Sequence, residues 1–205
     1  MPIGRSDVLQ MLREDNESLK QHNSQLTVKL SRNQQTFRAL NEMIAAMEKI
    51  DSRMDLVKLI HDLLLLVLHA CDSENGSILL LDEETNELVF VEVIGEAKDD
   101  LMNYRIDAST GIAGAVFKSQ QAQIVDDVHN SPDWYSDIDR EVGFKTQKIM
   151  CAPLMINSAP AGVLEVINIS SNGSFSHAEL DILCVAAKFV AIALEKVEGY
   201  FEKSE

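Results

Sequence analysis

The sequence predicts an α+β fold, in which about six mainly antiparallel strands are flanked by helices and preceded by a long N-terminal coiled-coil helix. Three observations predict it. A seven-residue apolar repeat occupies the first fifty residues. Short apolar segments bounded by turn residues follow, in pairs that read as hairpins. A helical apolar stripe closes the chain. We therefore divide the sequence into a coiled-coil helix at 1–50 and a globular domain at 51–205.

Composition and charge narrow the class of protein. The 205 residues are 46% hydrophobic and 25% charged, which is typical of a globular chain. Residues 1–50 carry seven Lys/Arg and six Asp/Glu, whereas residues 51–205 carry eleven and 27. This acidic excess counts against nucleic acid and anionic membrane as partners, because both select for Lys and Arg.

The three cysteines and the apolar runs indicate in which cellular compartment the protein is found. Cys71, Cys151 and Cys184 are far apart and form no Cys-x-x-Cys pattern, so we expect no zinc site. No basic-then-apolar signal segment opens the sequence. The most apolar run, Leu63–Leu68, is far shorter than the roughly 20 residues that a bilayer span needs. We expect a cytoplasmic protein with reduced thiols.

The first fifty residues carry the seam of a coiled coil. Two series of positions, each with a spacing of seven and offset by three, form a and d sites, and nine of the twelve are apolar. The seam is Leu9, Leu12, Asn16, Leu19, Asn23, Leu26, Leu30, Asn33, Phe37, Leu40, Ile44 and Met47. A lone helix leaves this stripe uncovered, so we expect a parallel homodimer, with Asn at a sites fixing the register. A stripe that packs on its own domain is the alternative.

The helical pattern continues beyond the coil. Met54, Val57, Ile60 and Leu64 extend an apolar face until the segment 72–76 interrupts it. We expect the coil to run into the first helix of the domain, in a joint that can transmit displacement.

After Gly76 the spacing of the apolar residues changes from that of a helix to that of β-strands. Two strands around a turn at 83–87 form a first hairpin, an acidic loop surrounds Asp99, and a turn at 157–161 joins a second hairpin. Ser109 or Thr110 caps a helix at 112–119. The expected strands are 77–82, 88–94, 104–106, 122–125, 148–156 and 162–168.

The last two features are a long connector and a final helix. The connector, 128–146, contains the single Trp, and a connector of that length is typical of a lid or binding loop. The helix begins near Ser176, where Ser176 and Glu179 form a capping box, and we expect it to end or fray at Gly199. The first and last helices of the domain should share one face of the sheet.

Six short motifs, in this order, resemble a GAF domain, the small-molecule sensor module related in fold to PAS domains. The resemblance covers roughly residues 55–198 and is specific for the fold rather than for a ligand. The motifs are Ala70–Asp72, Gly76–Ile78, Gly111–Val116, Ile124–Val128, Met150–Leu154 and Gly162–Asn168.

Cyclic-nucleotide-binding members of that family carry an Asn-Lys pair after the last strand, then Phe, then Asp-Glu. Here Ile169 follows Asn168, and Phe175 matches. Glu179 stands for the Asp, and Leu180 replaces the Glu. With half of the signature present, cyclic-nucleotide binding is a lesser alternative.

Another branch of the family reduces free methionine sulfoxide, with one cysteine between two glycines and a second in the lid. Here Ile112 and Ala113 lie between Gly111 and Gly114, and 128–146 contains no cysteine. We therefore do not expect an enzyme, and we keep the sulfoxide reductase only as a third hypothesis to be tested. No Gly-x-Ser-x-Gly, His-Glu-x-x-His or P-loop pattern occurs, and we assign no catalytic residue, metal or cofactor.

The resemblance places a ligand pocket under the connector. Asp126 or Asp127 can accept a hydrogen bond from a ligand amine or ring nitrogen, or can simply be solvated. Trp134 and Tyr135 can close over a planar ligand, or can pack on the domain's own core. The pocket candidates are Ile106, Ile112, Val125, Asp126, Asp127, Trp134, Tyr135, Met150, Leu164 and Val166.

The helix start at Gly111 can direct N–H groups at an anion. Asp107 and the two aspartates at 126–127 count against a strongly anionic ligand, unless Arg105 or Lys148 neutralises them.

These features predict a cytoplasmic, dimeric sensor that couples an unidentified small molecule to helix packing and signals through a partner protein. The alternative is a scaffold or adaptor dimer that binds no small molecule.

Overall fold

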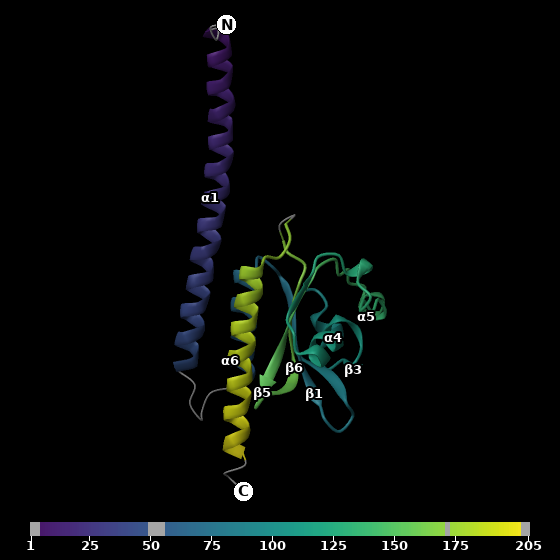
Figure 1. Cartoon of the computed structure of the whole chain (residues 1–205). Helices are drawn as coiled ribbons and strands as arrows, with labels where there is room; N and C mark the ends of the chain where they lie inside the picture. The colour runs from purple at the N-terminus through teal and green to yellow at the C-terminus, as the bar shows by residue number, and fades with distance from the viewer. Residues whose placement is uncertain (1–4, 49–55, 171–172, 202–205) are drawn as a thin grey trace. The chain divides into compact units, whose positions relative to one another are not determined.

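The computed structural model describes residues 5–48, 56–170 and 173–201. The chain divides into two compact units, residues 1–38 and 39–205. The first unit contains most of α1, an uninterrupted helix from Arg5 to Glu48 that contains neither Pro nor Gly (Figure 1). This confirms the long N-terminal helix.

The seam side chains that the structure describes are exposed on α1. Those of Leu9, Leu12, Leu19, Leu26, Leu30, Phe37 and Ile44 are 49% to 67% exposed. The side chains of Asn33, Leu40 and Met47 lie outside the described set, as does the joint 49–55. The predicted pairing of two chains and the predicted continuity of coil and domain therefore stay predictions.

The domain is built on a six-stranded sheet in which every pair of neighbouring strands is antiparallel, as predicted. The order is β3-β2-β1-β6-β5-β4, so the two long hairpins lie at the centre. The strands are β1 (Asn75–Asp82), β2 (Glu87–Ile94), β3 (Arg105–Asp107), β4 (Gln123–Val125), β5 (Ile149–Ile156) and β6 (Ala159–Ile167).

Helices cover both faces of this sheet (Figure 1). On one face α2 (Leu56–Ala70) packs beside α6 (His177–Phe201), as expected for the first and last helices of the domain. On the other face lie α4 (Gly111–Ser119) and the connector before β5. Because both faces are buried, the central strands have two separate apolar cores, one on each side.

Two local features predicted from the sequence are present in the structure: the capping box of α6 and the turn between β5 and β6. The Ser176 N–H donates to Glu179 Oε2 at 2.6 Å, and the Glu179 N–H donates to Ser176 Oγ at 3.4 Å, which completes the capping box. The β5–β6 hairpin turns at Asn157 and Ser158, both with positive φ, as a two-residue hairpin turn requires.

Three expectations were wrong in detail. The acidic loop contains a short helix, α3 (Lys98–Leu101), with two aspartates in its first turn, where the helix dipole favours them. Val57 is 65% exposed and leaves the apolar face of α2. The last helix continues through Gly199 to Phe201.

The predicted N-cap position of α4 is occupied by Thr110, one of the two candidates. Its side chain makes no capping hydrogen bond, and the Ser109 hydroxyl donates to Asp107.

A β-bulge in β2 changes which face its last residues point to. Leu79 pairs with Phe90 but Ile78 pairs with Glu92, so Val91 is the extra residue. Phe90 belongs to the core beside α4, whereas Glu92 turns toward α2 and lies 3.0 Å from His61 Nδ1. The bulge therefore places the buried Glu92 on the face of the sheet that α2 and α6 cover.

Candidate functional site

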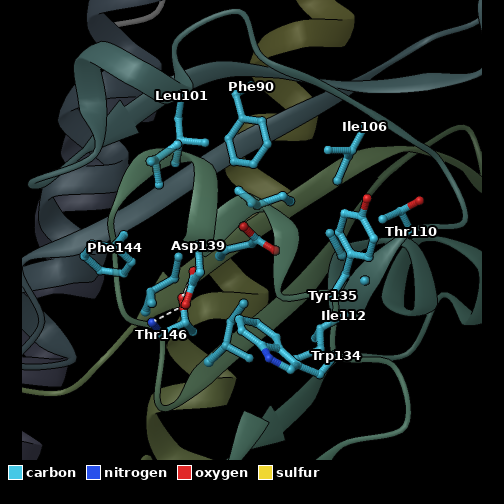
Figure 2. A pocket seen from close by; sticks show the side chains of 17 residues that line it. Phe90, Leu101, Ile106, Thr110, Ile112, Trp134, Tyr135, Asp139, Phe144 and Thr146 are labelled. Carbon is cyan, nitrogen blue, oxygen red and sulfur yellow. Dashed lines mark hydrogen bonds between the residues drawn. The ribbon is translucent and has the colours of Figure 1, made fainter. Parts of the chain in front are cut away.

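A cavity of about 70 Å³ lies on the face of the sheet opposite α2 and α6 (Figure 2). The central strands form its floor and the first turn of α4 forms one wall. Its cover is the segment 131–146, which contains α5 (Asp137–Val142) and which we call the lid. The lining is mainly apolar and includes four aromatic rings, those of Phe90, Trp134, Tyr135 and Phe144.

The lid is pinned to its surroundings at several points. Asp139 accepts hydrogen bonds from the backbone N–H and the hydroxyl of Thr146, at 2.7 and 2.8 Å, which closes the lid on itself before β5. The Tyr104 hydroxyl, on the segment before β3, donates to Glu141 at 2.5 Å. Trp134 packs edge-to-face on His129, with ring centroids 5.8 Å apart. These contacts hold the aromatic side chains of the lid over the cavity.

The floor of the cavity contains one buried carboxyl group. Glu165, on β6, is 5% exposed and accepts a hydrogen bond from Ser77 Oγ at 2.8 Å. The two residues are directly opposite each other on β6 and β1. Burial raises the pKa of Glu165 to about 7, and the hydrogen bond from Ser77 offsets part of that effect. A carboxyl group with a shifted pKa inside an apolar cavity marks a candidate binding site.

A smaller cavity of about 30 Å³ adjoins the first. Leu101, Phe144 and Ile167 line both cavities, so these side chains lie between them. Ser77 lines the smaller cavity and Glu165 the larger one. Movement of Phe144, which belongs to the lid, would therefore enlarge the space beside Glu165.

The structure brings four of the predicted pocket residues together at this cavity: Ile106, Ile112, Trp134 and Tyr135. Figure 2 shows the four side chains around one hollow, contributed by β3, α4 and the lid. Whether they contact a ligand stays a prediction.

Three predicted pocket residues lie on the wrong face of the sheet. Met150, Leu164 and Val166 are fully buried in the core formed with α2 and α6. Successive side chains of a strand point to opposite faces, so their neighbours Ile149, Glu165 and Ile167 line the cavity instead.

The other three predicted residues lie beside the site but not in its lining. Val125 ends the edge strand β4 and packs on the apolar core of the same face. Asp126 and Asp127 are exposed, and Asp127 accepts a hydrogen bond from the Asn130 side chain at 2.7 Å. This is the arrangement expected of a solvated loop rather than of a ligand contact.

Sequence reasoning missed the polar lining residues Thr110, Asp139, Thr146 and Glu165. A signal existed for Glu165, because it is the one charged residue in the otherwise apolar segment 162–167. A charged side chain inside a central strand needs a reason, and the cavity supplies it.

None of the three cysteines lines this cavity, although Cys151 lies opposite Glu165 on the neighbouring strand. Cys71 and Cys151 are fully buried, and burial raises the pKa of both thiols. Cys71 belongs to the core formed with α2 and α6, because the chain packs inward where α2 ends. In the ranges that the structure covers, no group of three His, Cys, Asp or Glu side chains is placed to hold a metal ion. None of the helices in those ranges combines the length and apolar character that a membrane span requires.

Comparisons with known proteins by sequence, by structure and by family model agree with one another. The chain is 27% identical over 131 residues to a probable 3′,5′-cyclic phosphodiesterase, pde-5, of Caenorhabditis elegans. The match covers 63% of this chain and only 17% of that protein.

The fold is shared with solved structures of low sequence identity. The GAF domain of a phosphoenolpyruvate-protein phosphotransferase from Coxiella burnetii superposes with a TM-score of 0.73 at 13% identity, over 82% of this chain and 98% of that one. The free methionine-R-sulfoxide reductase of Neisseria meningitidis superposes with a TM-score of 0.64 at 18% identity, over 77% and 89% of the two chains.

The family model of the GAF domain matches residues 55–194. GAF domains are known as signalling and sensor modules, and the predicted sheet, helices and motif order agree with this match. The chain therefore belongs to the GAF domain family.

Proposed function

We propose that this protein is a cytoplasmic sensor that dimerises through α1, binds a small molecule in the cavity beneath the lid and signals through a partner protein. The observation that carries the proposal is the mainly apolar cavity beneath the lid, with a single buried carboxyl group in its floor. Such a combination of apolar walls and few polar groups is typical of small-molecule sites.

The sheet supplies a path from the cavity to the helices. On β6, Glu165 and Ile167 line the cavity, whereas Leu164 and Val166 contact the core beside α2 and α6. A ligand that shifts these strands changes the packing of both helices. It can bias the protein only if it binds one packing more tightly than the other.

Native mass spectrometry of the gently purified full chain tests the proposal, because it reports subunit number and retained ligand together. We expect a dimer that carries a discrete adduct of small mass. A monomer would contradict dimerisation through α1. An adduct that also stays bound to a chain lacking the lid residues 131–146 would contradict binding in the cavity.

One observation favours a scaffold that binds no small molecule. The cavity volume of about 70 Å³ is well below the roughly 300–1,000 Å³ typical of ligand pockets. A sensor must open its lid to admit a ligand, whereas a scaffold needs only the dimer. A melting temperature that no metabolite mixture raises would support the scaffold, since a ligand specific for the folded state must stabilise it.

A further inference from the structure

We infer that the cavity selects a small organic cation, namely an ammonium group attached to a compact apolar body, and that Glu165 is the group that determines this specificity. The inference rests on the proposed small-molecule site and adds the chemical class of its ligand. It is drawn from the charges, aromatic rings and hydrogen bonds around the cavity.

The charged side chains described in the lining of the cavity are both acidic. Among the described residues that line it, the charged ones are Glu165 and Asp139, and none is Lys, Arg or His. Two basic residues near the cavity, Arg105 and Lys148, are engaged elsewhere. Arg105 contacts Asp82 at 2.8 Å and Glu87 at 3.0 Å, and Lys148 donates to the carbonyl of Gly173. A cation would therefore meet carboxyl groups, and an anion would meet no basic side chain.

Glu165 has free acceptor capacity. Its one partner among the described residues is the Ser77 hydroxyl, whereas an ionised carboxylate can accept about four hydrogen bonds. An ammonium group beside it would add charge-assisted hydrogen bonds and would favour the ionised carboxylate. Asp139 already accepts two bonds from Thr146, so Glu165 is the carboxyl group with room for a ligand.

The aromatic rings favour the same class. Phe90, Trp134, Tyr135 and Phe144 line the cavity with Glu165, and ring faces attract ammonium groups as well as apolar atoms. The small volume favours a compact ligand. One feature favours the opposite charge, because the first turn of α4 lines the cavity and free N–H groups attract acceptors. The experiment must therefore compare charges directly.

Three probes of nearly equal size make that comparison: benzylamine, benzyl alcohol and benzoate. Each is titrated into the full chain at pH 7.5 while the isoleucine δ1 methyl groups are followed by NMR. Ile106, Ile112 and Ile138 report on the cavity, and Ile78 and Ile182 on the opposite face serve as internal controls. We expect benzylamine to bind at least tenfold more tightly than the other two. Equal or tighter binding of benzoate would overturn the inference.

Glu165→Gln tests the assigned residue, and Glu92→Gln is its matched control. Both glutamates are buried in neighbouring parts of the sheet, but Glu92 faces α2. We expect Glu165→Gln to weaken benzylamine binding about tenfold and to change benzyl alcohol binding less than threefold, with Glu92→Gln leaving both unchanged. Unchanged benzylamine binding in a folded Glu165→Gln protein would overturn the inference.

The outcomes separate this inference from the proposed function. Binding of benzyl alcohol or benzoate in the cavity without a preference for benzylamine refutes the cation and leaves the small-molecule site. Failure of all three probes to shift the cavity methyls refutes the inference and counts against the site as well. The ranking of the probes on the unaltered chain does not depend on any variant folding.

Discussion

At the scale of single residues, Glu165 links the stability of the domain to pH. Its pKa is about 7 in the folded protein against 4.5 for an ordinary glutamate, because burial disfavours the charged form. The folded state therefore holds an extra proton between these two values. Its contribution to the free energy of unfolding is fully present below pH 4.5 and is lost as pH rises through about 7.

The first prediction concerns this loss. Between pH 5 and pH 8 the free energy of unfolding should fall by about 2–3 kcal/mol from Glu165 alone. Urea unfolding at the two pH values measures it. Glu165→Gln should largely abolish the difference, and Glu92→Gln should retain it. The exposed carboxyl groups of Asp82 and Asp107 have lowered pKa values and titrate below this range, so they do not obscure the result. A Glu165→Gln protein with undiminished pH dependence would refute the assignment.

The residue scale also shows what sequence reasoning can and cannot reach. The capping box at Ser176 and Glu179 was predictable, because both partners lie within four residues of each other. The partnership of Glu165 with Ser77 was not, because it joins residues 88 apart and depends on strand register. Tertiary contacts of this kind determine the polar part of the site.

At the scale of elements, the lid is the part of the domain that must move for a ligand to enter. It is tied to the rest of the domain through the hydrogen bond from Tyr104 to Glu141. Tyr135, by contrast, bonds Asp137 within the lid itself. The two tyrosines therefore form a matched pair, one holding the lid to its surroundings and one within it.

We predict that Tyr104→Phe loosens the lid. Losing a hydrogen bond worth about 1 kcal/mol should raise the exchange rate of the α5 amide protons about fivefold, while exchange in β1 and β6 stays unchanged. Hydrogen–deuterium exchange with mass spectrometry measures both. Tyr135→Phe should have little effect on the same amides. Equal effects of the two variants would show that the Tyr104 hydroxyl does not restrain the lid.

The faces of the central strands could not be predicted from their sequence. Apart from Glu165, the residues on both faces of β5 and β6 are apolar, because helices cover one side and the lid the other. Alternation of polar and apolar residues is then absent, and nothing distinguishes Met150 from Ile149 as a cavity residue. The strands themselves were predictable because Gly, Pro and Asn mark their ends.

Short helices escaped prediction for a related reason. The four residues of α3 and the six of α5 are too few to show a helical period. The connector was identified by its length and its Trp rather than by any helical pattern. Two of the residues that it places over the cavity, Trp134 and Tyr135, were expected, whereas Asp139 and Thr146 were not.

At the scale of the whole molecule, the exposed seam of α1 is the surface through which we propose that two copies associate. Leu19 and Leu26 occupy d sites and are 62% and 49% exposed in the single chain. We predict that the double variant Leu19→Asp/Leu26→Asp is a monomer with a folded domain. Analytical ultracentrifugation measures the mass against the 22.8 kDa of one chain, and circular dichroism checks the domain.

Two apolar residues outside the seam provide the control. Met11 and Val28 are 65% and 53% exposed but lie at outer positions of the repeat. The variant Met11→Asp/Val28→Asp adds the same charge and should remain a dimer. If the seam variant also stays dimeric, association belongs to the helices of the domain and not to α1.

The bulge at Val91 has a consequence for how the domain tolerates change. One extra residue acts on β2 as a frameshift acts on a gene, since everything after it points to the other side. Deleting Val91 would leave Phe90 opposite Leu79 and Glu92 opposite Ile78, so Glu92 would stay beside His61. Keeping Val91 but pairing it with Ile78 would instead place Glu92 opposite Ser77, on the side of Glu165. Two carboxyl groups would then be buried on one face and His61 would lose its partner. A slip of one position, with no change in the sequence, would thus reverse the separation of charge on which both sides of the sheet depend.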